Sequence, residues 1–222
     1  MPRPRALLSW SSGKDAAWSL HVLRQAGEVE VVGLLTTVND AFGRVAMHAV
    51  REELLEAQAS AAGLPLWKVR IPYPCPNEAY EAAMAEACTR AVTEGITEVA
   101  FGDLFLEEVR DYRLQKLAPT GLAARFPLWG RPTAELAREM IAGGLQARLT
   151  CVDPRALDPA FVGRAFDGDL LRDLPAEVDP CGERGEFHTF CHAGPMFERP
   201  IPIVPGEVVT RDGFTFADLR RA

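Results

Sequence analysis

The stretch that decides the fold is LLSWSSGKDAAWSL, residues 7–20. An apolar strand breaks into small residues at 11–13 (Ser-Ser-Gly), and a helical pattern begins at Lys14. The first backbone N–H groups of a helix have no partner within the helix, and the helix dipole makes that end positive. The order of strand, tight loop and helix start therefore predicts an anion-binding site. A simple helix N-cap, in which the serines and Asp15 satisfy those N–H groups, explains these residues equally well.

The rest of the first half repeats this alternation. Apolar runs lie at 5–10, 29–37, 66–71 and 97–102, and helical patterns lie at 14–26, 46–62 and 77–94. Glycines at 27, 63 and 95 mark the expected helix ends. Strands that alternate with helices predict a parallel sheet covered by helices on both faces. Such sheets bind ligands at the carboxyl ends of their strands.

The second half has a different pattern. A helical stretch near 104–118 is followed by a helix at 133–144, an apolar strand at 147–153 and a short helix around 168–174. From residue 185 onward, β-like segments alternate with turns, and Arg211-Asp212-Gly213 is typical of a hairpin turn. We therefore expect an α/β protein with a Rossmann-like domain over 1–120. A smaller C-terminal α+β domain over 121–222 would pack against it.

Composition limits the classes of function. With 222 residues, 48% of them hydrophobic, the chain can bury a proper core. Its formal charge of −7 argues against non-specific binding to nucleic acid or to an anionic membrane, because either needs a basic face. No run approaches the roughly 18 apolar residues of a membrane-spanning helix. The start MPRPRALLSW is not typical of a signal peptide, so we expect a cytoplasmic protein that acts away from membranes.

The cysteines give little sign of chemistry. They are odd in number, with no C-x-x-C pair and no metal-ligand spacing, at positions 75, 88, 151, 181 and 191. We interpret them as reduced thiols. Cys181 and Cys191 flank the distal motif described below, so a nucleophilic role is kept as a minor alternative.

The residues at 9–15 resemble the PP-loop, S-G-G-x-D-S, of the N-type ATP pyrophosphatases in the adenine nucleotide α-hydrolase-like superfamily. The stretch is neither a Walker A loop nor G-x-G-x-x-G. The resemblance implies a HUP-type Rossmann-like sheet and cleavage of ATP between its α and β phosphates, with Mg²⁺ as a further cofactor. By this resemblance the phosphates would lie on Ser9, Ser11, Ser12, Gly13, Lys14 and Asp15, and Asp15 would contact the metal.

Two positions depart from the PP-loop pattern. Ser12 replaces the usual second glycine, and Ala16 replaces the closing serine. The alanine removes one hydroxyl that would contact phosphate, whereas the backbone donors are unaffected.

A second match lies at 181–197, CGERGEFHTFCHAGPMF, which is similar to the G-E-x-G-E-F-H-T-F signature of the diphthine–ammonia ligase family. The segments FGDLFLEEVRDYR (101–113), FPLWG (126–130) and GLQARLTCVD (144–153) agree in the family's order, so the resemblance covers nearly the whole chain. It implies an ATP-dependent ligase that adenylates a carboxylate, releases pyrophosphate and lets ammonia attack. The carboxylate acceptor would belong to a small molecule or to a protein.

Three polar side chains of the distal motif are suited to this chemistry. In an extended segment Glu186 and His188 point to the same face, because successive side chains of a strand alternate. A carboxylate or a histidine can bind ammonium and accept its proton. Glu183, Glu186 and His188 are therefore candidate catalytic residues beside Lys14 and Asp15, and the sequence does not decide which is the base. A strand edge with solvated carboxylates is the plain alternative.

Other polar residues follow the predicted strands. The candidates for the nucleotide pocket are Thr36, Thr37, Asn39, Gly102 and Asp103. The candidates for acceptor binding are Arg110, Arg113, Gly185, Glu186 and Thr189. Each has a structural alternative, such as a polar turn, a helix N-cap at Asp103 or solvated surface arginines.

The sequence thus predicts a diphthine–ammonia ligase-like enzyme. One alternative is a PP-loop pyrophosphatase or nucleotide hydrolase with another small-molecule or RNA acceptor, although the acidic charge disfavours nucleic acid. The other is an ATP-binding module without turnover, which has no need of the distal motif. Oligomeric state is left open, a homo-oligomer included. All versions of the ligase prediction require residues 9–15 and 183–189 to line one cavity.

Overall fold

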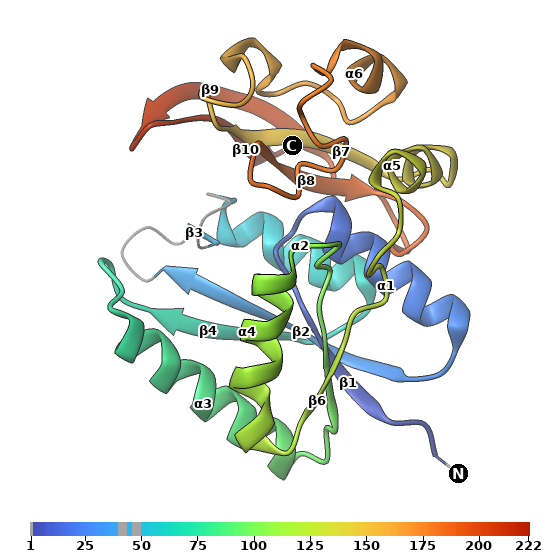
Figure 1. Cartoon of the computed structure of the whole chain (residues 1–222), viewed down its shortest axis with the longest axis vertical. Coiled ribbons are helices and arrows are strands. Elements are labelled where there is room, and N and C mark those ends of the chain that lie inside the picture. The colour runs from blue at the N-terminus through green and yellow to red at the C-terminus, as the bar shows by residue number, and fades with distance from the viewer. Residues whose placement is uncertain (1, 40–43, 46–49) are drawn as a thin grey trace.

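The structure is a computed structural model that describes residues 2–39, 44–45 and 50–222 (Figure 1). Five parallel strands of the first sheet lie in the order β4-β2-β1-β5-β6. Their bounds are β1 (Arg5–Ser9), β2 (Glu30–Asn39), β4 (Leu66–Ile71), β5 (Glu98–Ala100) and β6 (Ala123–Arg125). The short β3 (Arg44–Val45) pairs antiparallel with the end of β2. This is the expected Rossmann-like sheet.

Helices cover both faces of this sheet. The helices α1 (Lys14–Ala26) and α2 (Glu52–Ala62) share one core, and α3 (Asn77–Thr93) and α4 (Glu107–Leu117) share the other. Side chains of β1 alternate between the two, since Ala6 and Leu8 belong to the first core and Leu7 to the second. The predicted parallel α/β architecture is therefore confirmed.

The helix ends agree with the sequence where they are described. α1 ends at Gly27 (φ 63°) and α2 at Gly63 (φ 65°), a left-handed backbone that glycine adopts without strain. Residues 46–49, the predicted start of the second helix, lie outside the described residues, and α2 itself begins at Glu52.

The second half forms a four-stranded antiparallel sheet in the order β8-β7-β10-β9. The elements of this half are α5 (Thr133–Ala142), β7 (Gln146–Val152), α6 (Gly168–Asp173), β8 (Phe187–Ala193), β9 (Ile203–Arg211) and β10 (Phe214–Arg221), with a short 3-10 turn at Pro159–Phe161. Another 3-10 turn, Ala118–Thr120, precedes β6 in the first half. The predicted hairpin turn joins β9 to β10. Both of its central residues, Asp212 (φ 53°) and Gly213 (φ 81°), have the positive φ of a type I′ turn.

The chain leaves the first sheet after β6, which lies beyond residue 120 and pairs with β5. We call residues up to 125 the N-terminal lobe and residues from 133 the C-terminal lobe. One hydrophobic core crosses between them, because Leu8 of β1, Leu136 of α5 and Phe190 of β8 are fully buried in the same cluster. The two lobes therefore pack as one body.

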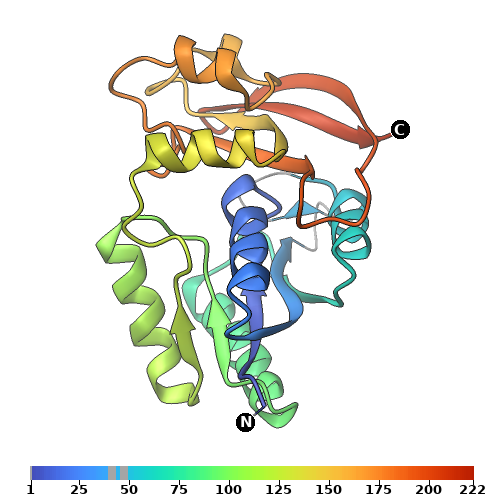
Figure 2. The ribbon, with the colours of Figure 1, turned by 90° about the vertical axis from the view of Figure 1, so that its right-hand side faces the viewer.

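The C-terminal sheet lies over the end of α1 that follows β1 (Figures 1 and 2). The backbone N–H of Cys191 in β8 donates to the carbonyl of Ser12 at 3.0 Å. This contact places the second lobe on the carboxyl edge of the parallel sheet, where such sheets bind ligands. Over the described ranges, the helices are all too short or too polar to cross a membrane.

Candidate active site

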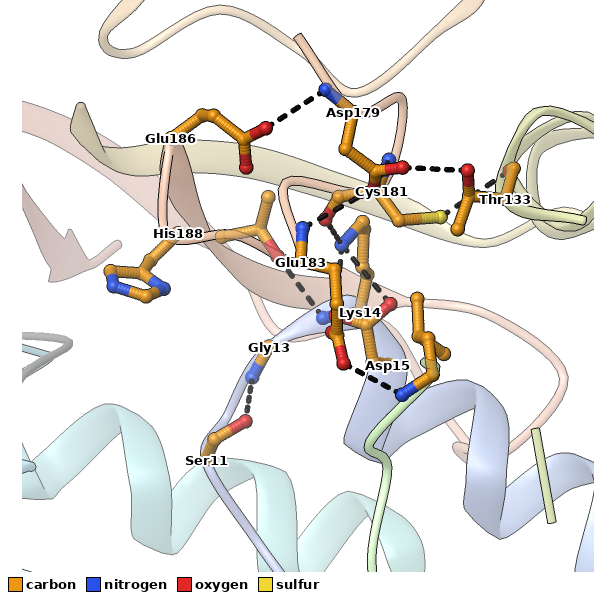
Figure 3. A network of polar contacts seen from close by, with 12 residues as sticks. Ser11, Gly13, Lys14, Asp15, Thr133, Asp179, Cys181, Glu183, Glu186 and His188 are labelled. Atoms are coloured by element: carbon orange, nitrogen blue, oxygen red, sulfur yellow. Dashed lines mark hydrogen bonds and ion pairs between the residues drawn. The ribbon is translucent and has the colours of Figure 1, made fainter. Parts of the chain in front are cut away.

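A polar cavity of about 210 Å³ lies between the lobes, and we call it the inter-lobe cavity. It is lined by Ser9, Ser11, residues 13–16, 101–103, Arg113, 181–183 and 187–189. The loop after β1 (residues 10–13, the first loop) and the distal segment (residues 181–189) therefore meet (Figure 3). The sequence predicted this meeting of two segments that are far apart in the chain.

The first loop is held by β8 of the other lobe. The backbone N–H of Lys14 donates to Oγ1 of Thr189 at 3.1 Å, and no side chain of the loop caps α1. A Cβ on Gly13 would lie 3.3 Å from the carbonyl oxygen of Thr189, so any other residue would make this approach tighter than usual. The plain N-cap interpretation is therefore replaced by a contact between lobes.

The buried Lys14 forms an ion pair with the partly exposed Asp15 at the start of α1. Nζ of Lys14 lies 2.8 and 3.0 Å from the two carboxylate oxygens of Asp15, and it also donates to the carbonyl of Cys181. Burial alone lowers the pKa of Lys14, but the charge of Asp15, the hydrogen bond to it and the charge of Glu183 outweigh burial and leave the pKa above its usual value. The ammonium thus ties the distal segment to α1, and its contact with phosphate stays a prediction.

Glu183 faces the inter-lobe cavity and also joins the lobes. Its Oε1 accepts the backbone N–H of Leu104 at 2.7 Å. Burial raises its pKa to about 7, against the lowering effect of the Leu104 N–H. At neutral pH this carboxyl group can therefore both accept and release a proton.

His188 lines the same cavity from β8. Burial, with a contribution from the charge of Lys14, lowers the pKa of His188 to about 4. The imidazole is therefore neutral at physiological pH and a weaker base than Glu183.

Glu186 corrects the prediction from the distal motif. It is buried outside the cavity wall, and its carboxylate accepts the backbone N–H groups of Asp179 and Arg184, both at 3.0 Å. Glu186 and His188 extend in different directions (Figure 3). The shared face was wrong because β8 begins at Phe187, so Glu186 lies in the preceding turn and outside the alternation of the strand. Gly185 belongs to that turn too, and it does not line the cavity.

Asp179 supports the distal segment and was not singled out in the sequence. Its Oδ1 accepts the N–H groups of Cys181 at 2.9 Å and Glu183 at 3.3 Å, and its Oδ2 accepts the hydroxyl of Thr133 at 2.6 Å. Its partners are mostly backbone groups, which leave no mark in the sequence. Gln58 was missed as well, although a polar residue on the apolar stripe of α2 was a signal.

A second cavity of about 540 Å³, the lateral cavity, lies between the first sheet and α3 and α4. Thr36 and Thr37 line it together with Tyr80 and Met84, whereas Asn39 does not. Oγ1 of Thr36 is buried and has no hydrogen-bond partner among the described residues. The two cavities share the lining residues Ser9, Ser11, Phe101 and Arg113, so they lie next to each other.

The FGDLF segment closes the side of the inter-lobe cavity. Asp103 pairs with Arg113 at 3.3 Å, and the Arg113 guanidinium lies over the ring of Phe101. A Cβ on Gly102 would lie 3.0 Å from the backbone nitrogen of Ala16, so glycine lets the segment reach the start of α1.

The two arginines predicted to bind the acceptor lie in different places. Arg113 lines both cavities, whereas Arg110 is stacked on Trp129 with 4.4 Å between the guanidinium carbon and the ring centre, and it lines neither. The structure thus brings Arg113 to the site and leaves Arg110 outside it.

The two cysteines beside the distal motif are thiols. Burial raises the pKa of Cys181 to about 12, and its Sγ donates to the carbonyl of Thr133. Cys191 is fully buried, and burial raises its pKa too. A nucleophilic cysteine therefore finds no support here, because the nucleophile is the thiolate.

The donor set for Mg²⁺ is sparse. The described residues include no group of three or more metal-ligating side chains. Both oxygens of Asp15 are engaged by Lys14, and Asp103 pairs with Arg113. Protein Mg²⁺ sites often use one or two carboxylates and the phosphates of the substrate. Asp15, Asp103 and Glu183 are the carboxyl groups that line the cavity, so the site fits Mg²⁺ only together with the phosphates of a nucleotide, and Mg²⁺ stays a prediction.

The fold and the site define a class of protein. It is a Rossmann-like α/β protein in which the loop after the first strand and a small antiparallel lobe enclose one polar cavity. Family models narrow this class, because the diphthamide synthase N-terminal domain matches residues 4–118 and the diphthamide synthase C-terminal domain matches residues 132–222. The chain belongs to the diphthamide synthase family.

Curated relatives carry the name diphthine–ammonia ligase. The proteins of Bos taurus and Homo sapiens are each 36% identical over 95 residues, which is 40% of this chain and 36% of the relative. The Danio rerio protein is 27% identical over 229 residues, covering 93% of this chain and 89% of the relative. The match thus spans about a third of the length of the mammalian relatives.

Proposed function

We propose that this protein is an ATP-dependent amide ligase. It adenylates a carboxylate, with release of pyrophosphate, and passes the acyl group from AMP to ammonia. The observation that carries the proposal is the hydrogen bond from the Lys14 N–H to Thr189 Oγ1 inside a cavity lined by both the first loop and the distal segment. The names of the relatives support ammonia as the second substrate.

ATP spans the two cavities in this proposal. The adenosine lies in the lateral cavity, where the hydroxyl of Thr36 offers an unused hydrogen bond to the base or the ribose. The phosphates lie on the first loop, where the N-terminus of α1 favours negative charge. Arg113 borders both cavities and supplies a cation near the α-phosphate. Catalysis of the first step is then mainly positioning and charge neutralisation.

Mg²⁺ bound to the phosphates would neutralise part of their charge, near Asp15 and Asp103. The carboxylate of the acceptor attacks the α-phosphorus, and the bond to the pyrophosphate oxygen breaks. The acceptor enters from the side of the distal segment, because the first loop and the lateral cavity are occupied by the nucleotide.

Glu183 is the base of the second step. Ammonia is mostly ammonium at neutral pH, so a carboxylate in the cavity first attracts the cation and then takes its proton. A base works best when its pKa lies near the working pH, and the pKa of Glu183, about 7, meets this condition. His188, with a pKa of about 4, is neutral and orients the substrate. Glu186 shapes the turn that presents both residues.

The test is release of pyrophosphate from ATP in the presence of carboxylate acceptors and ammonium. The ligase proposal predicts release that depends on the acceptor and an amide product that depends on ammonium. A protein that binds ATP without any release under these conditions would instead be a nucleotide-binding module. Release with an acceptor but without amide formation would indicate another PP-loop activity.

A further inference from the structure

Gln58 is a fully buried polar residue in the core beneath the first loop. It lies on α2, on the face that also buries Leu54 and Leu55. Its Nε2 donates to the carbonyl of Ser12 at 2.9 Å and to that of Cys191 at 2.6 Å, and its Oε1 accepts the indole N–H of Trp10 at 2.9 Å. The first loop and β8, which are far apart in the chain, thus converge on one amide of α2.

The orientation of this amide has no alternative. The indole of Trp10 can only donate, and the carbonyls of Ser12 and Cys191 can only accept. A flipped amide would place its NH₂ group against the indole N–H and its oxygen against two carbonyl oxygens. Both N–H donors of Gln58 are used, and its oxygen accepts the indole N–H. These hydrogen bonds compensate for the free-energy cost of removing the amide from water.

The carbonyl of Ser12 is held from two sides. It accepts from Gln58 and also from the backbone N–H of Cys191 at 3.0 Å. Ser12 itself has φ 69°, a backbone conformation that residues other than glycine adopt at a cost in free energy. A backbone in this state needs support from its surroundings.

The direction of this carbonyl decides the direction of a donor in the first loop. In a trans peptide the C=O of one residue and the N–H of the next point to opposite sides. With the Ser12 oxygen drawn into the core, the N–H of Gly13 points away from the core, toward Oγ of Ser11 at 3.3 Å. Both Ser11 and Gly13 line the inter-lobe cavity.

We propose that Gln58 is a positioning residue for phosphate binding: it fixes the Ser12–Gly13 peptide so that the Gly13 N–H faces the inter-lobe cavity. It acts through Ser12 and does not touch the nucleotide. The inference rests on the proposed binding of phosphates at the first loop. It adds that a side chain of α2, outside both cavities, sets the affinity for the phosphates and leaves the affinity for the nucleoside alone.

The experiment compares ATP, inorganic pyrophosphate and adenosine by calorimetry on wild type and Gln58→Met, which keeps the volume and removes both donors. We expect affinity for ATP and pyrophosphate to fall about tenfold or more, the cost of losing one hydrogen bond to a charged group. Adenosine affinity should fall less, staying within about twofold, because the lateral cavity is affected only at Trp10, whose indole N–H loses its acceptor. A matched control is Leu55→Ala, which destabilises the same helix without touching the loop and should leave the ratio of ATP to adenosine affinity unchanged.

A second variant keeps the inference testable if Gln58→Met does not fold. Gln58→Glu, protonated in its buried site, retains one of the two donors, and its loss of ATP affinity should be intermediate. Equal losses for ATP and adenosine, or no loss for ATP in either variant, would overturn the inference. Failure of the proposed function looks different, since wild type itself would then bind adenosine and ATP equally well. In that case a crystal structure of either variant still decides whether the Ser12–Gly13 peptide has turned.

Discussion

The two cavities at the carboxyl edge of the parallel sheet differ in how their polar groups are satisfied. Around the inter-lobe cavity, Glu183, Asp103 and Thr189 each have a protein partner, and the contacts mostly join one lobe to the other. The lateral cavity is walled largely by apolar and aromatic side chains, and Thr36 at its base has a buried hydroxyl without a partner among the described residues.

This difference separates two tasks. Polar groups that are already hydrogen-bonded are held in place, which suits a site that must position charge for a reaction. An apolar hollow with one unused hydroxyl gains its missing hydrogen bond when a flat, partly polar ligand enters. We therefore expect changes at the inter-lobe cavity to affect turnover and changes at the lateral cavity to affect nucleotide affinity. The predictions below test this division.

The largest effect should come from Glu183→Gln. The amide oxygen can still accept the Leu104 N–H, but the side chain no longer takes a proton from ammonium. Amide formation should fall at least about 100-fold, while ATP affinity changes little. The deficit should shrink at alkaline pH, where more of the ammonia is unprotonated. Turnover and ATP binding are measured side by side, with a substitution at an exposed carboxylate, Glu177→Gln, as the control. Wild-type rates of amide formation in Glu183→Gln would show that Glu183 is not the base.

His188 should make the protein sensitive to acid. Its pKa is about 4 in the folded protein and near 6.5 when unfolded, so between these values the unfolded state binds more protons. Stability contributed by the neutral imidazole is therefore present above pH 6.5 and lost as the pH falls to 4. Relative to His188→Gln, wild type should lose about 3 kcal/mol over this window in chemical unfolding experiments. If the free energy of unfolding depended on pH in the same way for the two proteins, His188 would be solvated in the folded state.

Gly102 tests the wall of the inter-lobe cavity next to Phe101. A Cβ in Gly102→Ala would approach the backbone nitrogen of Ala16 to 3.0 Å and the carbonyl carbon of Asp15 to 3.1 Å, and these helix backbone atoms cannot move independently. We expect a loss of about 1–2 kcal/mol in the free energy of unfolding and weaker ATP binding. Gly168→Ala, at an open position of α6, is the control and should be neutral. Unchanged ATP affinity in Gly102→Ala would mean that the wall does not shape the site.

Thr36→Val should have opposite effects on stability and binding. The substitution keeps the shape and removes a buried hydroxyl that has no partner in the described parts of the chain, so the protein without ligand should be more stable by up to about 1 kcal/mol. Adenosine affinity should fall a few-fold, whereas pyrophosphate affinity should not change. Thr36→Ser keeps the hydroxyl and should bind adenosine as wild type does. A loss of pyrophosphate affinity in Thr36→Val would contradict the separation of the two cavities.

Sequence patterns were sufficient to predict the strands, helix ends and turns that depend on local backbone preferences. The strand, loop and helix at 7–20, the helix ends at Gly27 and Gly63 and the turn at Asp212-Gly213 all follow from local backbone preferences. The meeting of the first loop with the distal segment came from the family resemblance, since parallel strands place their loops at one edge but do not say what covers it.

The roles of individual site residues could not be predicted in the same way. Glu183 and Glu186 are three residues apart in one motif, yet one faces the cavity and the other ties a turn, because β8 begins only at Phe187. Asp179 holds backbone N–H groups of its own segment and Gln58 holds carbonyls of two distant segments, and backbone groups are the same for every sequence. Such roles depend on tertiary packing, which periodicity does not contain.

The smallest effect should come from Ser12→Gly, at the seam between the lobes. Ser12 has a left-handed φ of 69° and a buried hydroxyl without a partner among the described residues, so glycine relieves both costs. Glycine also adds conformational entropy to the unfolded chain, which offsets part of the gain. We expect a net stabilisation of about 0.5 kcal/mol in thermal unfolding and unchanged ATP affinity, because Gln58 still holds the carbonyl.

Ser12→Ala separates the two costs: it removes the hydroxyl and keeps the strained Cβ, so stabilisation by glycine but not by alanine would assign the cost to the backbone. A fall in ATP affinity in Ser12→Gly would show instead that the serine side chain takes part in binding. The inter-lobe cavity would then bind ATP with a hydroxyl that has no partner among the described residues, in addition to groups that are already hydrogen-bonded within the protein.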